Sequence, residues 1–337
     1  MLTAKKYTYF IGIDVSRNEL DFAINSGQDF LFHREIPNTP SSITQLIEDI
    51  RLLPKFMMTR ALFCMEATGI YCNHLLNCLK KYKADCVVEN ALHIKLSGGA
   101  LRGKDDKIDS VRIANYASKN HRKLRLFTGK RPVVEQISEL FTLRQRLIST
   151  KVLLKTPIEE QGGFVKKNLL IQNRNFCKNS IAAVETDLSQ IDLEILKLIN
   201  NDERLHKLFT IITSVPSIGT ITVIQIIIST NEYRNFTNPK KFACYAGIAP
   251  FGNSSGKTKG KSKISQLANK KIKSLLHICA MGVIRYDKEL KAYYERKTKG
   301  ENKSKMAVLN AVRYKLVLRV FACLAQDRLY EKEYERK

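Results

Sequence analysis

The chain has 337 residues and a formal net charge of +25, from 57 lysine and arginine residues against 32 aspartate and glutamate residues. It contains no run of about 18 uncharged apolar residues, which excludes a membrane-spanning helix. Its eight cysteines form no CxxC pair and no cluster with histidine, which argues against a zinc site or a disulfide scaffold.

Residues 1–127 are predicted to fold as an α/β domain with a mixed sheet. The expected elements, in chain order, are strands at 7–16, 19–24 and 29–36, a helix capped by Ser41 or Ser42, a strand at 61–66, a helix at about 70–82, a strand at 84–88 and another short helix. Acids end two of these strands, at the edge where open α/β sheets place their sites.

Residues 128–206 are predicted to form a helical, coiled-coil segment. Apolar residues recur every seven positions near its start, and alternate three and four apart further along. Pro157 and Gly162–Gly163 interrupt the segment, so two or more helices are expected. Packing within one subunit and an oligomer seam explain the pattern equally well. The residues of the two runs are Val134, Phe141 and Ile148, then Ile181, Val184, Leu188, Ile191, Ile195 and Leu198.

Residues 207–337 are predicted to form a mainly α-helical C-terminal domain with 26 basic and 9 acidic residues. Two apolar helices within 208–228 flank the turn Val215–Gly219, which can present backbone N–H groups to a phosphate. A loop rich in glycine, serine and lysine is expected at 252–265, followed by helices at about 265–285 and 304–326.

No acidic residue occurs between Glu232 and Asp287. A run of lysines is often a solvated face, but the lack of any interleaved acid favours a phosphate-binding surface, and nucleic acid is the most common polyanionic partner. The residues predicted to bind nucleic acid are Lys257, Lys259, Lys261, Lys263, Lys270, Lys271 and Lys273.

Four carboxylates of the first region, Asp14, Glu66, Asp106 and Asp109, are candidates for a metal site. Asp14 and Glu66 end apolar strands, where an acid is costly to bury without a partner. Asp106 and Asp109 start a predicted helix three residues apart and project from one face, and Asp105 ranks below Asp106 on spacing. Each acid alone could be an ordinary turn or first-turn residue. Together, without histidine or cysteine ligands, they favour Mg²⁺ or Mn²⁺, which prefer oxygen and act in phosphodiester chemistry.

Several motifs, in order and over nearly the whole chain, resemble those of the DEDD transposases of the IS-one-ten insertion-sequence family. They are Ile-Gly-Ile-Asp14-Val-Ser, Met65-Glu66-Ala-Thr-Gly, Asp106-Lys-Ile-Asp109-Ser-Val-Arg, Val-Pro-Ser-Ile-Gly219, Tyr-Ala-Gly-Ile-Ala-Pro250 and the pair Ser255-Gly256. The resemblance implies a RuvC-like, RNase H-type domain, a helical middle and a C-terminal transposase domain. It implies that Asp14, Glu66, Asp106 and Asp109 are the catalytic, metal-binding acids and that Ser255 is the nucleophile. The usual Pro-Gly-Ile-Gly turn of the family here has Ser217 in place of its first glycine.

The resemblance also implies partners. A transposase of this kind cuts and rejoins donor and target DNA, and is guided by a structured noncoding bridge RNA. We expect a homo-oligomer, a dimer or a tetramer, in the cytosol of a bacterium or archaeon, with no membrane partner and with reduced thiols.

Two other functions remain open on the residues alone. A RuvC-like, structure-selective nuclease would hydrolyse DNA with metal-activated water and would need no serine. A non-catalytic nucleic-acid-binding protein would use the basic C-terminal region and give no metal-dependent DNA product. Ser254 is the rival of Ser255, because both lie in the same stretch.

Overall fold

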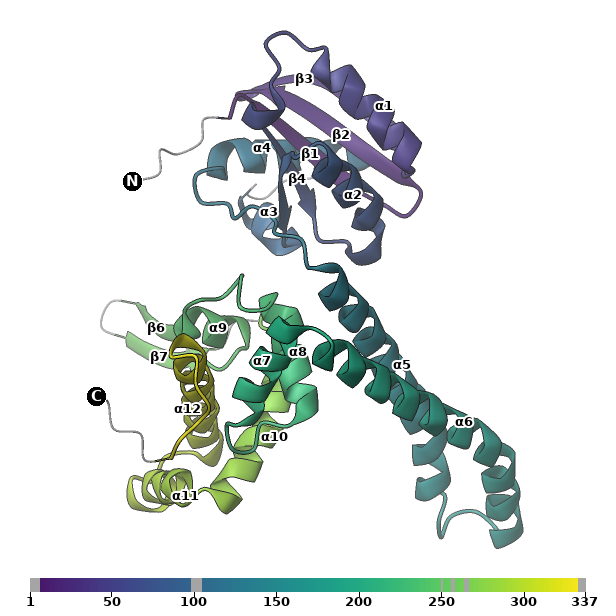
Figure 1. Cartoon of the computed structure of the whole chain (residues 1–337), viewed down its shortest axis with the longest axis vertical. Coiled ribbons are helices and arrows are strands. Elements are labelled where there is room, and N and C mark those ends of the chain that lie inside the picture. The colour runs from purple at the N-terminus through teal and green to yellow at the C-terminus, as the bar shows by residue number, and fades with distance from the viewer. Residues whose placement is uncertain (1–6, 98–104, 250, 256–257, 264–266, 333–337) are drawn as a thin grey trace. The chain divides into compact units, whose positions relative to one another are not determined.

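The structure is a computed structural model that describes residues 7–97, 105–249, 251–255, 258–263 and 267–332 (Figure 1). Residues 251–255 and 258–263 are described by their backbone and its pairing alone. Contacts divide the chain into unit 1, Met1–Gly129, and unit 2, Lys130–Lys337, and each unit is described by itself. Among the described residues, no helix is long and apolar enough to cross a membrane.

Unit 1 contains a five-stranded mixed sheet with the order β3-β2-β1-β4-β5. Strands β1, β2 and β3 are antiparallel, whereas β1, β4 and β5 run parallel. The mixed α/β sheet predicted from the sequence is therefore confirmed, in an order that fits an RNase H-like domain. The elements are β1 (Tyr9–Val15), β2 (Glu19–Ser26), β3 (Asp29–Pro37), α1 (Pro40–Arg51), η1 (Met58–Arg60), β4 (Ala61–Glu66), η2 (Gly69–Cys72), α2 (Asn73–Lys81), β5 (Asp85–Glu89), α3 (Ala91–Ser97) and α4 (Asp106–Asn120).

The two faces of this sheet carry different helices. Successive side chains of a strand point to opposite faces, so the odd-numbered and even-numbered residues of β1 face different helices. Ile11 and Ile13 pack with the buried residues of α1 and α2, whereas Phe10 packs with those of α3 and α4. Asp14, like Phe10, is an even-numbered residue of β1, so its side chain points to the face of the sheet that α4 covers.

Gly12 lets α4 lie directly against β1. A Cβ atom at this position would lie 2.2 Å from the carbonyl oxygen of Ser110 and 2.2 Å from the amide nitrogen of Ala114. Any side chain larger than hydrogen would force the helix away from the sheet. The close approach holds the first turn of α4, with Asp106 and Asp109, at the end of β1 where Asp14 stands.

The cap predicted for the first helix is wrong. Thr39 is the N-cap of α1, and its hydroxyl accepts a hydrogen bond from the Ser42 amide at 3.3 Å. Pro40 takes the first helical position, where its fixed φ suits the helix and its missing N–H costs nothing. The helix consequently begins before Ser41 and Ser42, which lie inside its first turn.

Unit 2 consists of helices and one two-stranded antiparallel hairpin, so the mainly helical character predicted for the rest of the chain is confirmed. Its main core joins the bases of α5 and α6 to α7, α8, α10 and α12. The elements are α5 (Pro132–Glu160), α6 (Lys167–Asn200), α7 (Glu203–Thr213), α8 (Thr220–Thr230), α9 (Pro239–Tyr245), β6 (Phe251–Ser255), β7 (Thr258–Lys263), α10 (Lys270–Tyr286), α11 (Lys288–Glu295), the π-helical turn η3 (Arg296–Gly300) and α12 (Lys305–Ala325).

Helices α5 and α6 form the long hairpin of Figure 1. The heptad residues at its base pack within the chain: Val134 and Phe141 of α5 share a core with Ile191 and Ile195 of α6. The subunit-internal explanation of the pattern therefore accounts for these positions. The predicted interruption is confirmed, because α5 ends at Glu160 and α6 begins at Lys167, on either side of Gly162–Gly163. Pro157 lies in the last turn of α5, three residues before the helix ends.

The segment predicted as a glycine, serine and lysine loop is instead the hairpin β6–β7, in which Ser255 pairs with Thr258. A strand pair needs only backbone hydrogen bonds, so a segment of small and polar residues can form one. The next helix also starts later than predicted, at Lys270, where the Asn269 side chain accepts a hydrogen bond from the Ile272 amide at 3.1 Å.

A buried ion-pair network holds the start of α5. Arg131, the residue before α5, makes a two-pronged contact with Asp202 at 2.7 and 2.9 Å, and also binds Glu232 at 2.6 Å. Glu232 is 1% exposed and lies 3.1 Å from Arg204 as well. Because an unpaired carboxylate at that depth would be costly, these arginines fix the α8–α9 connection to the α6–α7 junction.

Candidate active site

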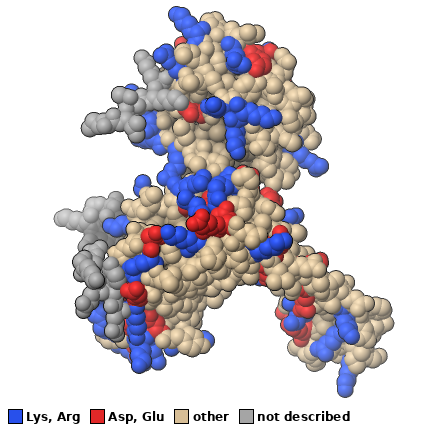
Figure 2. Space-filling view, viewed as in Figure 1, with Lys and Arg blue, Asp and Glu red and all other residues tan. Residues whose placement is uncertain are grey.

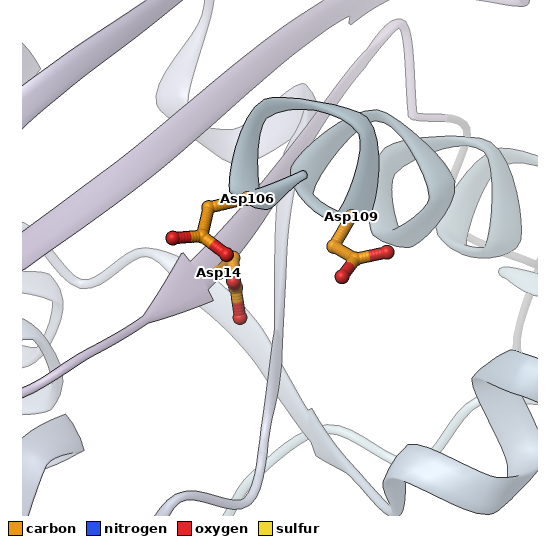
Figure 3. Close-up of side chains that lie close together, drawn as sticks. All are labelled: Asp14, Asp106 and Asp109. Carbon is orange, nitrogen blue, oxygen red and sulfur yellow. The ribbon is translucent and has the colours of Figure 1, made fainter. Parts of the chain in front are cut away.

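Three carboxylates meet at the end of the unit 1 sheet. Asp14, at the end of β1, and Asp106 and Asp109, on the first turn of α4, each place an oxygen within 4.8 Å of the others (Figure 3). These are three of the four acids predicted from the sequence to form one cluster. The structure brings Asp14 and Asp106 together although they are 92 positions apart in the sequence.

The electrostatics of Asp14 show that the cluster is strained by its own charge. Burial, followed by the carboxylates of Asp106 and Glu66, raises the pKa of Asp14 from 3.8 to about 6. The Val15 amide opposes the shift by donating a hydrogen bond to Asp14 Oδ1 at 3.0 Å. Desolvation and like charge therefore outweigh the one hydrogen bond that favours the ionised form.

Glu66 is the fourth predicted acid and ends β4, the strand beside β1. Burial raises its pKa, and the nearby carboxylate of Asp109 adds to the shift. Its charge is thus coupled to the cluster, although its oxygens lie outside the 4.8 Å group formed by the three aspartates.

The acids at the beginning of α4 have different hydrogen-bond partners. Asp105 is the N-cap, and its side chain accepts a hydrogen bond from the Lys107 amide at 3.1 Å. Asp106 is the first helical residue and faces Asp14, which agrees with ranking it above Asp105. Asp109 is bound by Arg112 at 2.6 Å, one turn further along the helix. Arg112 therefore neutralises part of the charge of the cluster and orients one carboxylate.

The donor set fits a hard divalent cation. All the close groups are carboxylate oxygens, the ligands that Mg²⁺ and Mn²⁺ prefer, and a histidine or cysteine does not occur in the group of described residues. A cation held by Asp14, Asp106 and Asp109 would reverse the repulsion that raises the pKa of Asp14.

Sequence reasoning missed Glu89, a further acid at the same edge. Glu89 ends β5 and pairs in register with Glu66, so both side chains point to the α4 face. Its carboxylate accepts hydrogen bonds from the Tyr116 hydroxyl at 3.1 Å and the Asn90 amide at 2.9 Å, and lies 2.8 Å from His93 Nδ1. The sequence does contain a signal for Glu89, because it ends an apolar strand as Glu66 does. It was missed because the strand was predicted to end at Val88.

The predicted basic residues lie on the hairpin β6–β7 and the start of α10. Lys259, Lys261 and Lys263 belong to β7, Lys270, Lys271 and Lys273 to the first turns of α10, and Lys257 lies outside the described residues. Ser255 ends β6, with Ser254 next to it. On the face drawn in Figure 2, lysine and arginine side chains are spread over both units.

Two family models match the chain. Residues 11–161 match a model described as a transposase, of the DEDD type of IS110, and residues 209–295 match the transposase family IS116/IS110/IS902. The first match spans the strands and helices that carry all four predicted acids, and the second spans the hairpin β6–β7.

Relatives matched over all or part of their length agree with these family models. The chain is 26% identical to a pilin gene-inverting protein of Moraxella bovis over 331 residues, which is 96% of this chain and 98% of the relative. It is 22% identical to the transposase for insertion sequence element IS1111A of Coxiella burnetii, over 61% of this chain and 64% of that protein. An uncharacterized protein of the insertion element IS110 from Streptomyces coelicolor is 24% identical over 45% of this chain and 36% of its own length.

Proposed function

The chain belongs to the IS110 (IS-one-ten) family of DEDD transposases and is a DNA recombination enzyme, and we propose that it cuts DNA strands with Ser255 as nucleophile and a divalent cation held by Asp14, Glu66, Asp106 and Asp109. The observation that carries the proposal is the convergence of Asp14, Asp106 and Asp109 within 4.8 Å. Such a carboxylate group costs the fold free energy, which a structural role does not explain.

The acids would act by holding positive charge next to a DNA phosphate. A bound Mg²⁺ or Mn²⁺ polarises a phosphate and stabilises the charge that develops on its oxygens. Asp14 can contribute only when it is ionised, so its raised pKa makes cation binding depend on pH. Arg112 fixes the orientation of Asp109, and Gly12 sets the distance between α4 and β1.

The serine would conserve the energy of the phosphodiester. The Ser255 oxygen loses its proton and forms a bond to phosphorus, while a deoxyribose oxygen leaves with the electron pair of its P–O bond and takes up a proton. One phosphodiester is exchanged for another, so the reverse reaction with a second DNA strand reseals the backbone without ATP or a ligase.

The relatives support a reaction that rejoins DNA. The Moraxella proteins are named for inverting a gene, and inversion requires broken strands to be joined again in a new order. Hydrolysis by a RuvC-like nuclease leaves free ends and does not achieve this. The domain organisation that we propose has a catalytic domain at 1–127, a helical segment at 128–206 and a serine-bearing domain at 207–337.

The proposal includes a guide RNA. The net charge of +25 and the acid-free stretch that contains the proposed lysines suit a polyanion, and family resemblance makes a noncoding bridge RNA the second nucleic acid beside DNA. The protein would then contact backbone phosphates, and base pairing would select the sites. A dimer or tetramer would bring two strand exchanges together.

The test is a recombination assay with labelled DNA. Full-length protein is incubated with Mg²⁺, DNA carrying the ends of the element and transcripts of its flanking noncoding DNA, and the products are separated by denaturing electrophoresis. Wild-type protein should give a covalent protein–DNA adduct that peptide mapping assigns to Ser255. Ser255→Ala should lose adduct and recombinants and keep DNA binding, whereas Ser254→Ala, the matched control, should keep all three.

Each rival function has its own result. Loss of the adduct in Ser254→Ala alone would move the nucleophile by one residue. Cleavage to free ends without any adduct would mean a RuvC-like nuclease, and no metal-dependent DNA product would mean a non-catalytic binding protein. Omitting the transcripts tests the RNA, because recombination that is unchanged without them contradicts guidance.

A further inference from the structure

Unit 2 has an open groove between α5, α8 and the start of α10. Its volume is about 470 Å³, which is within the range of sites that hold a small molecule. Apolar side chains, two side-chain amides and two lysines line it, namely Phe141, Ile228, Gln145, Gln225, Lys270 and Lys271. No carboxylate is among the described residues around the groove. The groove therefore combines apolar surface, amide groups and positive charge.

Gln225 is the buried polar side chain of this groove. It is 8% exposed, and its Nε2 donates a hydrogen bond to Ser229 Oγ at 2.8 Å, one turn further along α8. Its Oε1 accepts no hydrogen bond from any described residue, and it remains open to the groove. An acceptor at this depth costs free energy unless water or a ligand donates to it. An occupant of the groove should therefore present an N–H group to Gln225.

The start of α10 offers groups that bind an anion. The Asn269 side chain accepts a hydrogen bond from the Ile272 amide, and the Asn269 carbonyl oxygen accepts one from the Lys273 amide at 3.1 Å. The amides of Lys270 and Lys271 have no partner among the described residues, and both side chains are exposed. Free amides and two ammonium groups at the positive end of a helix suit a phosphate.

We propose that the groove binds one unpaired nucleotide of a nucleic-acid strand, with its phosphate against the start of α10 and its base against Gln145 and Gln225. This inference rests on the proposed function, in which the chain binds DNA and a guide RNA. A nucleobase has a flat apolar face and an edge that carries N–H donors, and a glutamine amide can pair with a donor and an acceptor on that edge. In a duplex the Watson–Crick edge is already paired, so the groove selects single strands.

The test measures binding of single strands of about 12 nucleotides to the full-length protein in EDTA, where no metal-dependent cleavage occurs. An adenine strand is compared with an abasic strand that has the same number of phosphates, and with a blunt duplex. Wild-type protein should bind the adenine strand about tenfold more tightly than the abasic strand, or more. Gln145→Met and Gln225→Met should each reduce this preference below about threefold and leave duplex binding within about twofold of wild type.

Gln136→Met is the matched control. Gln136 is an exposed glutamine of the same helix as Gln145 and does not line the groove. It lies nine positions before Gln145, about two and a half helical turns, and so on the opposite side of α5. This variant should bind all three probes as wild-type protein does.

Further measurements locate the nucleotide and identify its source. Lys270→Met and Lys271→Met should each lower the slope of the log–log salt dependence of single-strand binding by about 0.7. A strand that contains one 4-thiothymine should photocrosslink to α5, α8 or the start of α10. The variants are also measured with RNA and DNA strands of one sequence, and the strand that Gln145→Met weakens more identifies guide RNA or DNA as the source of the nucleotide.

Any of four results would overturn the inference. They are equal binding of adenine and abasic strands by wild-type protein, an unchanged preference in Gln145→Met, an unchanged salt slope in both lysine variants, and a crosslink only outside α5, α8 and α10. Gln145 is only partly buried, so its variant tests the groove even where Gln225→Met fails to fold. Failure of the proposed function is distinguishable, because it appears as a missing Ser255 adduct, and these binding assays require no cleavage.

Discussion

Replacing Asp14 by asparagine should stabilise the metal-free protein while destroying its ability to use a divalent cation. Asp14 has its pKa raised from 3.8 to about 6, chiefly by burial and by the facing carboxylate of Asp106. A raised pKa means that the native state resists ionisation of the group. The contribution to stability is complete below pH 3.8 and is lost as the pH rises through about 6.

The magnitude follows from the shift. Two pKa units correspond to about 3 kcal/mol, and screening by solvent at this partly exposed side chain reduces the expected effect to about 1–2 kcal/mol. Asparagine is uncharged and its oxygen can still accept the hydrogen bond of the Val15 amide. Asp14→Asn should therefore raise the free energy of unfolding of unit 1 by about 1–2 kcal/mol at pH 7.5 and leave it nearly unchanged at pH 4.

Amide hydrogen exchange in β1 and β4, with EDTA present, measures the stability of unit 1 at both pH values. Asp29→Asn, an exposed acid at the start of β3, is the matched control and should change neither value. Adding Mg²⁺ should stabilise wild-type protein at pH 7.5 and have no such effect on Asp14→Asn. A variant that is equally stable or less stable at pH 7.5 would refute the view that like charges strain this site.

Four further changes test other parts of the structure. Gly12→Ala should lower the free energy of unfolding by about 3 kcal/mol, because the new methyl group meets the backbone of α4, and a loss below about 0.5 kcal/mol in urea denaturation would contradict that packing. Ser217→Gly should raise Tm by about 2 °C, because glycine adopts the φ of 65° without a Cβ penalty, and a lower Tm would show that the serine hydroxyl matters more. Glu232→Gln should cost about 3 kcal/mol in urea denaturation, since Arg131 loses a buried charge partner, and a neutral result would mean that the network is solvated. Neutralising the four lysines of segment 257–263 should flatten the log–log salt dependence of nucleic-acid binding by roughly one unit per lysine, and an unchanged slope would mark a solvated face.

The sequence predicted the sheet well because central strands such as β1 and β4 are apolar on both faces and end at an acid. Asp14 and Glu66 were found for that reason, and Asp106 and Asp109 by their spacing at a helix start. What it could not give is the distance between α4 and β1, which depends on Gly12 having no side chain. Nor could it place Glu89 next to Glu66, because that neighbourhood depends on β5 pairing with β4.

Turn chemistry accounts for the errors. The first helix begins at Pro40 instead of at the serines, because a proline at the first helical position outweighs the serine caps that follow it. The sequence of this segment has the small and charged residues of a loop, yet the backbone of residues 251–255 pairs with that of residues 258–263 as β6 and β7. Composition indicates which side chains can be buried, and it says little about which backbones pair.

Each unit contains charged side chains that lack a nearby opposite charge, and these are carboxylates in unit 1 and an arginine in unit 2. Unit 1 gathers carboxylates whose mutual repulsion holds Asp14 partly protonated near pH 6, so it lacks a positive charge. Unit 2 contains in Arg313 a buried cation with no acid beside it among the described residues, so it lacks a negative charge. Under the proposed function, a divalent cation held by Asp14, Asp106 and Asp109 would supply the charge that unit 1 lacks, so Mg²⁺ should stabilise unit 1 even in the absence of DNA.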